Sequence, residues 1–367
     1  MPARNHRNWL KKPTNVEYVS SEIYSSQEIF EAEQKEIFSK VWVPMCHKSE
    51  MSEPGNFRTT QIAGQNIIAV NNGDSIKSYL NTGKFNTPSG TMTRVEFLMD
   101  DYTPLPTEVK HGGMVWTTLN KNPDMDVEQW TAGAFDCIAE AIDTEELECF
   151  HYHKAIIPTN YKLWHDTNSE FYHDFMHYFN RVTGFNDEYF ARKNVPFDNG
   201  HVNVSSFTVN YTEFDKDGDR GELSFPNLPP NQWYMVDLFP GFNFNLRGSA
   251  YRSDSVTPLG PNSVLIEFRG YGLLKDTPEE RQTRIRHHNT IWGPFGRNLH
   301  EDLLGVTGQG ASMAPGTEER TILHGRHENS TIHDEVGMRH YYAEWGKYLD
   351  LDPSKPVSKF ENINKAA

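Results

Sequence analysis

The sequence predicts an α+β protein with two domains. Its 367 residues exceed the usual length of one domain. From Trp42 to about Asn120, short runs rich in β-branched and aromatic residues alternate with turn signals such as Pro54-Gly55, a pattern typical of a small antiparallel barrel or sandwich. The remaining chain mixes β-rich runs with helical segments, as expected for helices packed on a mostly antiparallel sheet. We expect an N-terminal arm and helix over residues 1–41, a β domain over 42–120 and an α+β domain over 121–367.

The helices each have a local signal. Ser26 is a suitable N-cap for a helix that continues through Phe38, and Pro278 followed by two glutamates is typical of a helix start. Further helical segments are expected over residues 127–146, 165–182 and 338–349, and the helix from Pro278 is expected to reach residue 298. Strands are expected from residue 150 and between residues 202 and 272.

Charge and hydropathy exclude several classes of protein. The net charge of −15 argues against a nucleic-acid partner, because such partners are bound through basic patches. No segment approaches the roughly 20 consecutive apolar residues of a membrane span, and the basic N-terminus lacks the apolar stretch of a secretory signal. We therefore expect a cytoplasmic protein that binds neither nucleic acid nor membrane.

The three cysteines, Cys46, Cys137 and Cys149, stand far apart in the chain. So sparse and odd a set forms no disulfide framework, and no C-x-x-C pair is present for zinc or redox chemistry. We expect buried, unreactive thiols.

The strongest chemical signal lies between residues 170 and 177. On one unbroken helix, Glu170, His173 and His177 would share a face, because residues at i, i+3 and i+7 do so. Two imidazoles four residues apart can bind one metal ion. A chain with 16 histidines also contains such pairs by chance, so the spacing alone leaves a purely structural pair open.

A third ligand has to come from a distant part of the chain. Asp302, after the helix expected to end near residue 298, is the natural candidate, and Glu301 beside it is interpreted as a solvated acid. Two histidines and one carboxylate leave positions open for dioxygen on an iron ion, as in non-haem Fe(II) oxygenases.

Around these residues the sequence resembles a known family, the catalytic alpha subunits of Rieske non-haem iron oxygenases of the aromatic-ring-hydroxylating type. The matching segments are Trp42, Cys46-His47 and Glu53–Thr60 in the first domain, and Asn160–Lys162 and Tyr172-His173 in the second. The resemblance implies a helix-grip (Bet v1/START-like) catalytic domain preceded by a Rieske-like antiparallel β domain.

The resemblance also implies roles for the site residues. His173, His177 and Asp302 would hold one Fe(II) ion. Glu170 would lie on the electron route from a neighbouring subunit's cluster, and Asp166 would support the helix or the proton supply. The family usually separates its two histidines by four or five residues, whereas three intervene here.

The ligands of a Rieske cluster are missing from their family positions. Such a cluster needs two cysteines and two histidines, which the family carries in C-x-H and C-x-x-H motifs. Gly83 and Phe85 stand at the first motif, and residues 87–120 contain no cysteine. We therefore expect a β domain without a [2Fe–2S] cluster.

A chain without a cluster needs electrons from outside. The resemblance therefore implies a Rieske-bearing homologous subunit, assembled with this chain in a trimer or hexamer, and a ferredoxin or reductase that supplies it. It also implies a small apolar substrate, cyclic or aromatic, that is hydroxylated as in aromatic-hydrocarbon catabolism.

Two other functions stay open. The chain could be a non-catalytic structural partner of such an oxygenase, because Gly83 and Phe85 indicate that loss of ligands is tolerated in its first half. Alternatively, the cavity of the second domain could bind an apolar ligand such as a lipid or steroid without any metal.

Overall fold

The computed structural model of the protein describes six stretches of the chain. They are residues 17–81, 87–91, 102–178, 185–209, 223–324 and 331–355. Gly83 and Phe85, on which the expected loss of the first cluster motif rests, lie outside these residues.

A seven-stranded antiparallel sheet is the largest element of the fold. Its strand order is β10-β16-β15-β14-β13-β12-β11, and every neighbouring pair is antiparallel. The strands are β10 (Leu147–Ile157), β11 (Asn194–Pro196), β12 (Val202–Thr208), β13 (Gln232–Leu238), β14 (Phe242–Arg247), β15 (Ala250–Gly260) and β16 (Ser263–Leu273).

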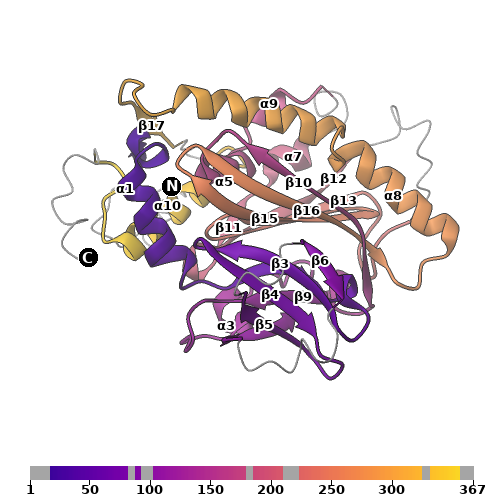
Figure 1. Cartoon of the computed structure of the whole chain (residues 1–367). Helices are drawn as coiled ribbons and strands as arrows, with labels where there is room; N and C mark the ends of the chain where they lie inside the picture. The colour runs from indigo at the N-terminus through magenta and orange to yellow at the C-terminus, as the bar shows by residue number, and fades with distance from the viewer. Residues whose placement is uncertain are drawn as a thin grey trace.

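The two faces of this sheet differ in polarity. On β14, Phe242, Phe244 and Leu246 belong to the main hydrophobic core, while the alternating residues are Asn243, Asn245 and Arg247. Because successive side chains of a strand point to opposite faces, these polar residues share the other face. Helices α8 (Pro278–Trp292) and α9 (Arg297–Ser312) run one after the other along one side of the sheet, and the small sheets lie on the opposite side (Figure 1).

Two smaller sheets pack against the apolar face. A three-stranded sheet has the order β2-β9-β8, and a five-stranded sheet has the order β6-β3-β4-β5-β7. Trp116 of β9 lies 6.0 Å from Phe244, ring centre to ring centre, and Ser255 of β15 donates a 2.7 Å hydrogen bond to the carbonyl of Pro44. One hydrophobic core therefore runs from the small sheets into the large one. The strands are β2 (Val43–His47), β3 (Asn56–Ile62), β4 (Gln65–Asn71), β5 (Ile76–Leu80), β6 (Ser89–Thr91), β7 (Pro104–Leu105), β8 (Thr107–Lys110) and β9 (Met114–Thr117).

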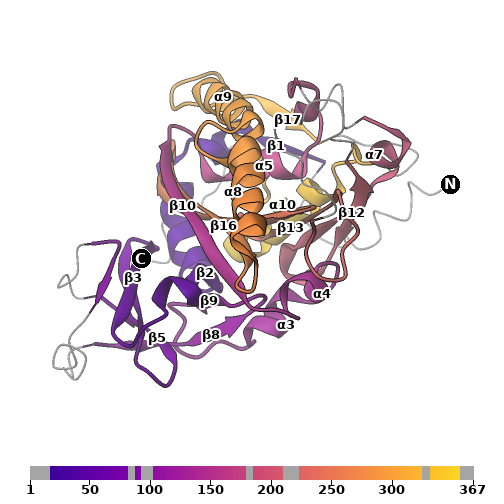
Figure 2. The ribbon, with the colours of Figure 1, turned by 90° about the vertical axis from the view of Figure 1, so that its right-hand side faces the viewer.

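Segments from both ends of the described chain lie together at one side of the molecule (Figures 1 and 2). Strand β1 (Tyr18–Ser20) pairs with β17 (Thr321–Leu323). Helix α1 (Gln27–Glu33), capped by Ser26 as predicted, continues as a π turn, η3 (Gln34–Phe38). Helix α10 (Val336–Leu349) lies beside it. The other short helices are η2 (Ser21–Tyr24), η4 (Lys48–Met51), α3 (Val127–Thr131), α4 (Ala139–Ile142), α7 (Asp187–Ala191) and η6 (Asp198–Gly200).

Two expected helices are wrong in extent. The helix expected over residues 127–146 is interrupted because Ala132 has a left-handed backbone with φ 54°. The helix from Pro278 ends at Trp292, because the following Gly293-Pro294 turn cannot continue it. A new helix then begins at Arg297, so Asp302 lies within a helix and does not follow one.

Within the described part of the chain, the structure contains no helix of the length and apolar character that crossing a membrane requires.

A buried ion pair joins three helices. Lys162 of α5 (Tyr161–Ser169) donates a 2.6 Å hydrogen bond to Glu33 of α1, and both side chains are 0% exposed. Trp345 of α10 donates to the same carboxylate oxygen at 2.7 Å. Since α5 leads into residues 170–177, this pair anchors the helix that precedes the predicted metal ligands.

We expect Lys162→Met to lower the free energy of unfolding by about 3–5 kcal/mol, because it leaves the Glu33 carboxylate buried without its cation. Urea unfolding followed by circular dichroism measures this change. Lys35→Met is the control, since that side chain is 60% exposed, and its effect should stay within about 0.5 kcal/mol. Equal effects of the two substitutions would contradict the role assigned to the buried pair.

Candidate metal centre

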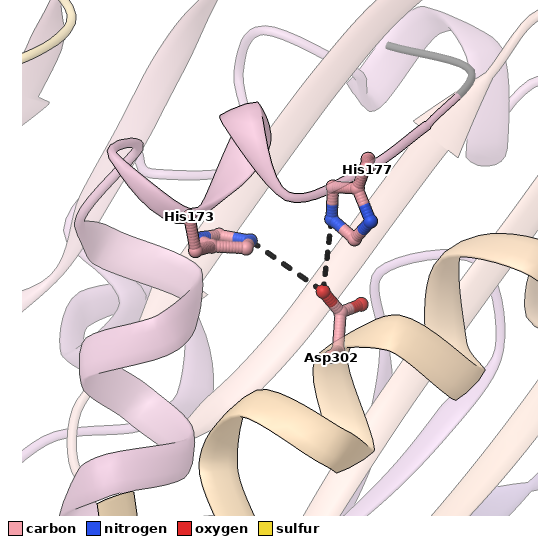
Figure 3. Close-up of side chains that lie close together, drawn as sticks. All are labelled: His173, His177 and Asp302. Carbon is pink, nitrogen blue, oxygen red and sulfur yellow. Dashed lines mark ion pairs between the residues drawn. The ribbon is translucent and has the colours of Figure 1, made fainter. Parts of the chain in front are cut away.

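Three predicted ligands meet at one point of the structure. His173, His177 and Asp302 each offer a ligand atom, and these atoms lie within 4.8 Å of one another. Asp302 Oδ1 is 3.0 Å from His177 Nε2 and 3.5 Å from His173 Nε2. Figure 3 shows both rings directed at this carboxylate, which projects from α9. The fold thus brings Asp302 next to two histidines that lie far from it in the sequence.

The two histidines do not lie on one unbroken helix, so that prediction is wrong. Helix α5 ends at Ser169, and Glu170 has an extended backbone with φ −94° and ψ 150°. The chain then forms a single 3-10 turn, η5 (His173–Phe175), before His177. The two rings still approach, with centres 5.3 Å apart. Because of the break at Glu170, two histidines with only three residues between them can direct their rings to the same point.

A carboxylate holds the second ring nitrogen of each histidine. His173 Nδ1 lies 2.6 Å from Glu170 Oε1, and His177 Nδ1 lies 2.7 Å from Glu301 Oε2. A carboxylate that accepts the Nδ1 proton directs Nε2 toward the metal position, the usual support of metal-binding histidines. Burial alone lowers the pKa of His173, but the neighbouring acids outweigh burial and raise the pKa to about 10, so a metal ion would displace the proton of Nε2. Glu301 is therefore part of the site, and its interpretation as a solvated acid is wrong.

Asp302 is placed as a ligand would be. Its Oδ1 is buried and, among the described residues, accepts no hydrogen bond although His177 Nε2 is 3.0 Å away. Burial alone raises the pKa of Asp302, but the neighbouring His177, His173 and Arg252 outweigh burial and hold the pKa below its usual value. The carboxylate is thus ionised, and its free oxygen and two imidazole nitrogens suit a divalent cation of the iron group.

A further acid borders the centre and was not predicted. Asp174 Oδ1 lies 3.8 Å from His173 Nε2 and 3.9 Å from His177 Nε2, while its other oxygen accepts a 2.8 Å hydrogen bond from Tyr189. Its position directly after His173 was the only sequence signal available for it.

Asp166 is not brought to this centre. Its carboxylate is buried in α5 and accepts hydrogen bonds from Tyr24 at 2.7 Å and from Tyr342 at 3.0 Å. Burial raises its pKa to about 6. These contacts join α5 to the N-terminal segment and α10, which agrees with support of the helix, whereas a part in proton supply stays a prediction.

The metal centre borders a cavity on the polar face of the large sheet. Besides the three candidate ligands, its lining includes aromatic rings and three arginines: Phe171, Phe207, Trp233, Trp292, Arg192, Arg247 and Arg252. A small molecule in this cavity would lie against the candidate ligands.

Comparison with known proteins gives the family. No family model matches the chain. The methanesulfonate monooxygenase hydroxylase subunit alpha of Methylosulfonomonas methylovora is 53% identical over 97% of both chains. The 2-aminobenzenesulfonate 2,3-dioxygenase subunit alpha of an Alcaligenes species is 31% identical over 92% of this chain and 96% of its own. The chain belongs to the alpha subunits of Rieske-type oxygenases.

This alpha subunit is therefore an oxidoreductase and a catalytic oxygenase subunit, which confirms the family resemblance. Its fold is shared with solved structures of the family. Naphthalene 1,2-dioxygenase from Rhodococcus superposes with a TM-score of 0.72 at 14% identity, over 90% of this chain and 94% of that chain. The boundaries at residues 41 and 120 and the helix-grip description of the larger domain stay predictions.

We expect Glu301→Ala to weaken the binding of a divalent metal ion about 10- to 100-fold, because His177 loses the carboxylate that fixes its ring and its tautomer. Titration of metal-free protein with Fe(II) under anaerobic conditions measures the affinity. Glu318→Ala removes an exposed acid and should leave the affinity unchanged. If Glu301→Ala binds the ion as tightly as the control, Glu301 does not support a ligand.

Proposed function

We propose that His173, His177 and Asp302 hold one Fe(II) ion, and that the alpha subunit uses it to hydroxylate a small substrate with dioxygen and electrons from a cluster on another chain. The observation that supports this most directly is the convergence of both Nε2 atoms on the free oxygen of Asp302. When bound, an iron ion with this facial set of ligands offers open positions at which dioxygen is reduced.

The chain's own residues prepare the site in two ways. Glu170 and Glu301 fix the imidazole rings, and the side chain of Glu170 is only 13% exposed. The aromatic rings of Phe171 and Trp292 line the cavity and restrict water around the reacting atoms. The residues present therefore fit a mononuclear iron ion.

The residues present do not fit a Rieske cluster. The whole chain has three cysteines, so a Cys₂His₂ set would have to use two of them. Cys46 is buried in β2, and Cys149 lies in β10 of another sheet with its thiol near the carbonyl of His151 at 3.4 Å. Burial raises the pKa of both thiols, and it raises that of Cys137 to about 12. Such thiols are poor metal ligands, because coordination requires the thiolate.

The alignment with the methanesulfonate enzyme contains gaps in this chain. It extends over 403 positions, which exceeds the 367 residues of this chain by 36, so at least that many positions of the relative lie opposite gaps in this chain. The chain thus lacks internal residues that the relative has.

Electrons then have to enter from a partner. We propose a Rieske-bearing subunit next to the metal centre, supplied by a ferredoxin or reductase, in a trimer or hexamer. Glu170 bonds His173 directly, so an electron route through Glu170 would reach the centre through one ligand. Tyr172 and Phe175, which flank His173, are 44% and 45% exposed, so a partner can approach this segment.

We expect purified protein reconstituted with Fe(II) to contain about one iron and no acid-labile sulfide per chain. His173→Ala should lose the iron and lower oxygenase activity in the reconstituted system at least about 100-fold, because two protein ligands hold the ion poorly. His300→Ala is the matched control, since His300 is an exposed histidine on α9. Iron and sulfide analysis, with activity measured beside a Rieske-bearing partner, tests both parts.

Each outcome bears on a different part of the proposal. Acid-labile sulfide in stoichiometric amount would contradict the absence of the cluster. Full activity after His173→Ala would contradict catalysis at this centre and support the structural-partner function. Absence of iron from the wild-type chain after reconstitution would contradict the metal site.

A further inference from the structure

Three arginines form one wall of the cavity beside the metal centre. Arg247 and Arg252 both stack near Trp292, with the guanidinium carbons 5.5 Å and 4.9 Å from the ring centre. Arg192 lies 4.6 Å from the centre of the Trp233 ring. All five side chains line the cavity.

The register of the sheet explains why these side chains meet. Trp233 of β13 pairs directly with Arg247 of β14. Asn245, two residues before Arg247 and on the same face, pairs with Arg252 of β15. Arg192 comes from the segment after α7 and covers this face from outside. Burial lowers the pKa of Arg192 to about 10, and the charge of Arg247 adds to the effect, so the two guanidinium groups lie within electrostatic reach.

The arginines have donors that the described residues do not use. Arg192 and Arg252 are 2% and 3% exposed, and Arg247 is half-buried. Among the described residues, no acceptor hydrogen-bonds to four of their buried nitrogens, which are Arg192 Nη2, Arg247 Nε, Arg252 Nε and Arg252 Nη1. Leaving a buried charged donor without an acceptor is energetically unfavourable. A ligand with several anionic oxygens would satisfy them.

The charges of the lining also leave room for an anion. Three arginines face two carboxylates, those of Asp174 and Asp302. Arg252 is paired with buried Asp254 through Nη2 at 2.8 Å, which leaves its other nitrogens for the cavity. Arg192 Nη2 lies 3.7 Å from Asp174, so Arg247 is the arginine of this wall that has no carboxylate partner among the described residues, and its charge is available to an anion.

We propose that Arg192, Arg247 and Arg252 bind the sulfonate group of a small alkanesulfonate and hold its alkyl carbon toward His173, His177 and Asp302. This inference rests on the proposed function for the reaction, but the binding step can be tested without iron. A sulfonate replaces the apolar, cyclic substrate that the resemblance implied. An apolar molecule offers no acceptors to the guanidinium donors that lack them among the described residues.

The number of donors favours a sulfonate over a carboxylate. A sulfonate presents three anionic oxygens in a tripod, which can accept from guanidinium groups on three different elements, while a carboxylate presents two oxygens in a plane. The two relatives that match nearly the whole chain are named for methanesulfonate and for 2-aminobenzenesulfonate, so a sulfonate is the group common to both names.

The size of the cavity favours the smaller substrate. Its volume is about 60 Å³, which has room for roughly four or five water molecules. A sulfonate with a short alkyl chain fills such a space, whereas a bicyclic arene exceeds it. In methanesulfonate the reacting carbon is bonded directly to sulfur, so the arginine wall fixes it next to the candidate ligands.

Calorimetric titration of iron-free and iron-loaded protein with methanesulfonate tests this site. We expect measurable binding in both forms, and a dissociation constant about 10- to 100-fold higher for Arg247→Met, as expected for loss of a charged hydrogen-bond donor. Arg247 is the position to change because it is half-buried and because, among the described residues, its loss leaves no buried carboxylate without its cation. Arg286→Met, an exposed arginine on α8, is the control, and circular dichroism verifies that each variant is folded.

Two further ligands separate the possible binding modes. Dimethyl sulfone has nearly the same shape without the charge, and acetate has the charge without the tripod, so both should bind at least about tenfold more weakly. Equal binding of dimethyl sulfone, equal binding of acetate, or an unchanged affinity in Arg247→Met would each overturn the proposal. Uptake of iron with no methanesulfonate binding contradicts the sulfonate site alone. Methanesulfonate binding by protein that takes up no iron on reconstitution contradicts the proposed iron site alone.

Discussion

The two nitrogens of each imidazole have different neighbours, and this arrangement determines the chemistry of the site. Glu170 and Glu301 hold Nδ1 of His173 and His177, so Nε2 of each ring faces Asp302. A histidine pair without these carboxylates would rotate or take the other tautomer. The helix break at residue 170 and the start of α9 at residue 297 serve this arrangement, because they place an acid beside each ring.

The large sheet imposes a second constraint on the sequence. One of its faces must be apolar to pack into the core, and the other carries polar and charged side chains. Phe244 packs into the core shared with the small sheets, and its neighbour Asn245 faces the cavity. Strand alternation makes such a face possible, but buried polar groups are stable only where they find partners. Asp237, for example, accepts a 2.5 Å hydrogen bond from Ser169 at the end of α5. At the arginine wall the described residues leave several donors without acceptors, and a ligand is the partner that we propose for them.

The sequence allowed prediction of the residues that converge at the candidate metal centre better than of the backbone that presents them. His173, His177 and Asp302 could be named because metal ligands are restricted to few residue types and the family motif surrounds them. The broken helix at Glu170 could not be predicted, since no glycine or proline marks it. Glu301 was misjudged because an acid on a helix is usually solvated. The arginines have no motif at all: Arg247 and Arg252 meet through the register of β14 and β15, and Arg192 comes from the segment after α7.

The small β domain contributes to the packing of the whole molecule. His47, in the family's cysteine-histidine segment, is buried and has both ring nitrogens in use: Nδ1 lies 2.8 Å from Ser49 Oγ, and Nε2 lies 2.7 Å from the carbonyl of Gly112. Burial lowers its pKa to about 4, so the ring is neutral and joins η4 to the β8–β9 turn. Trp116 meanwhile packs onto Phe244 of the large sheet. The small domain thus supports the large sheet through packing contacts of its own residues.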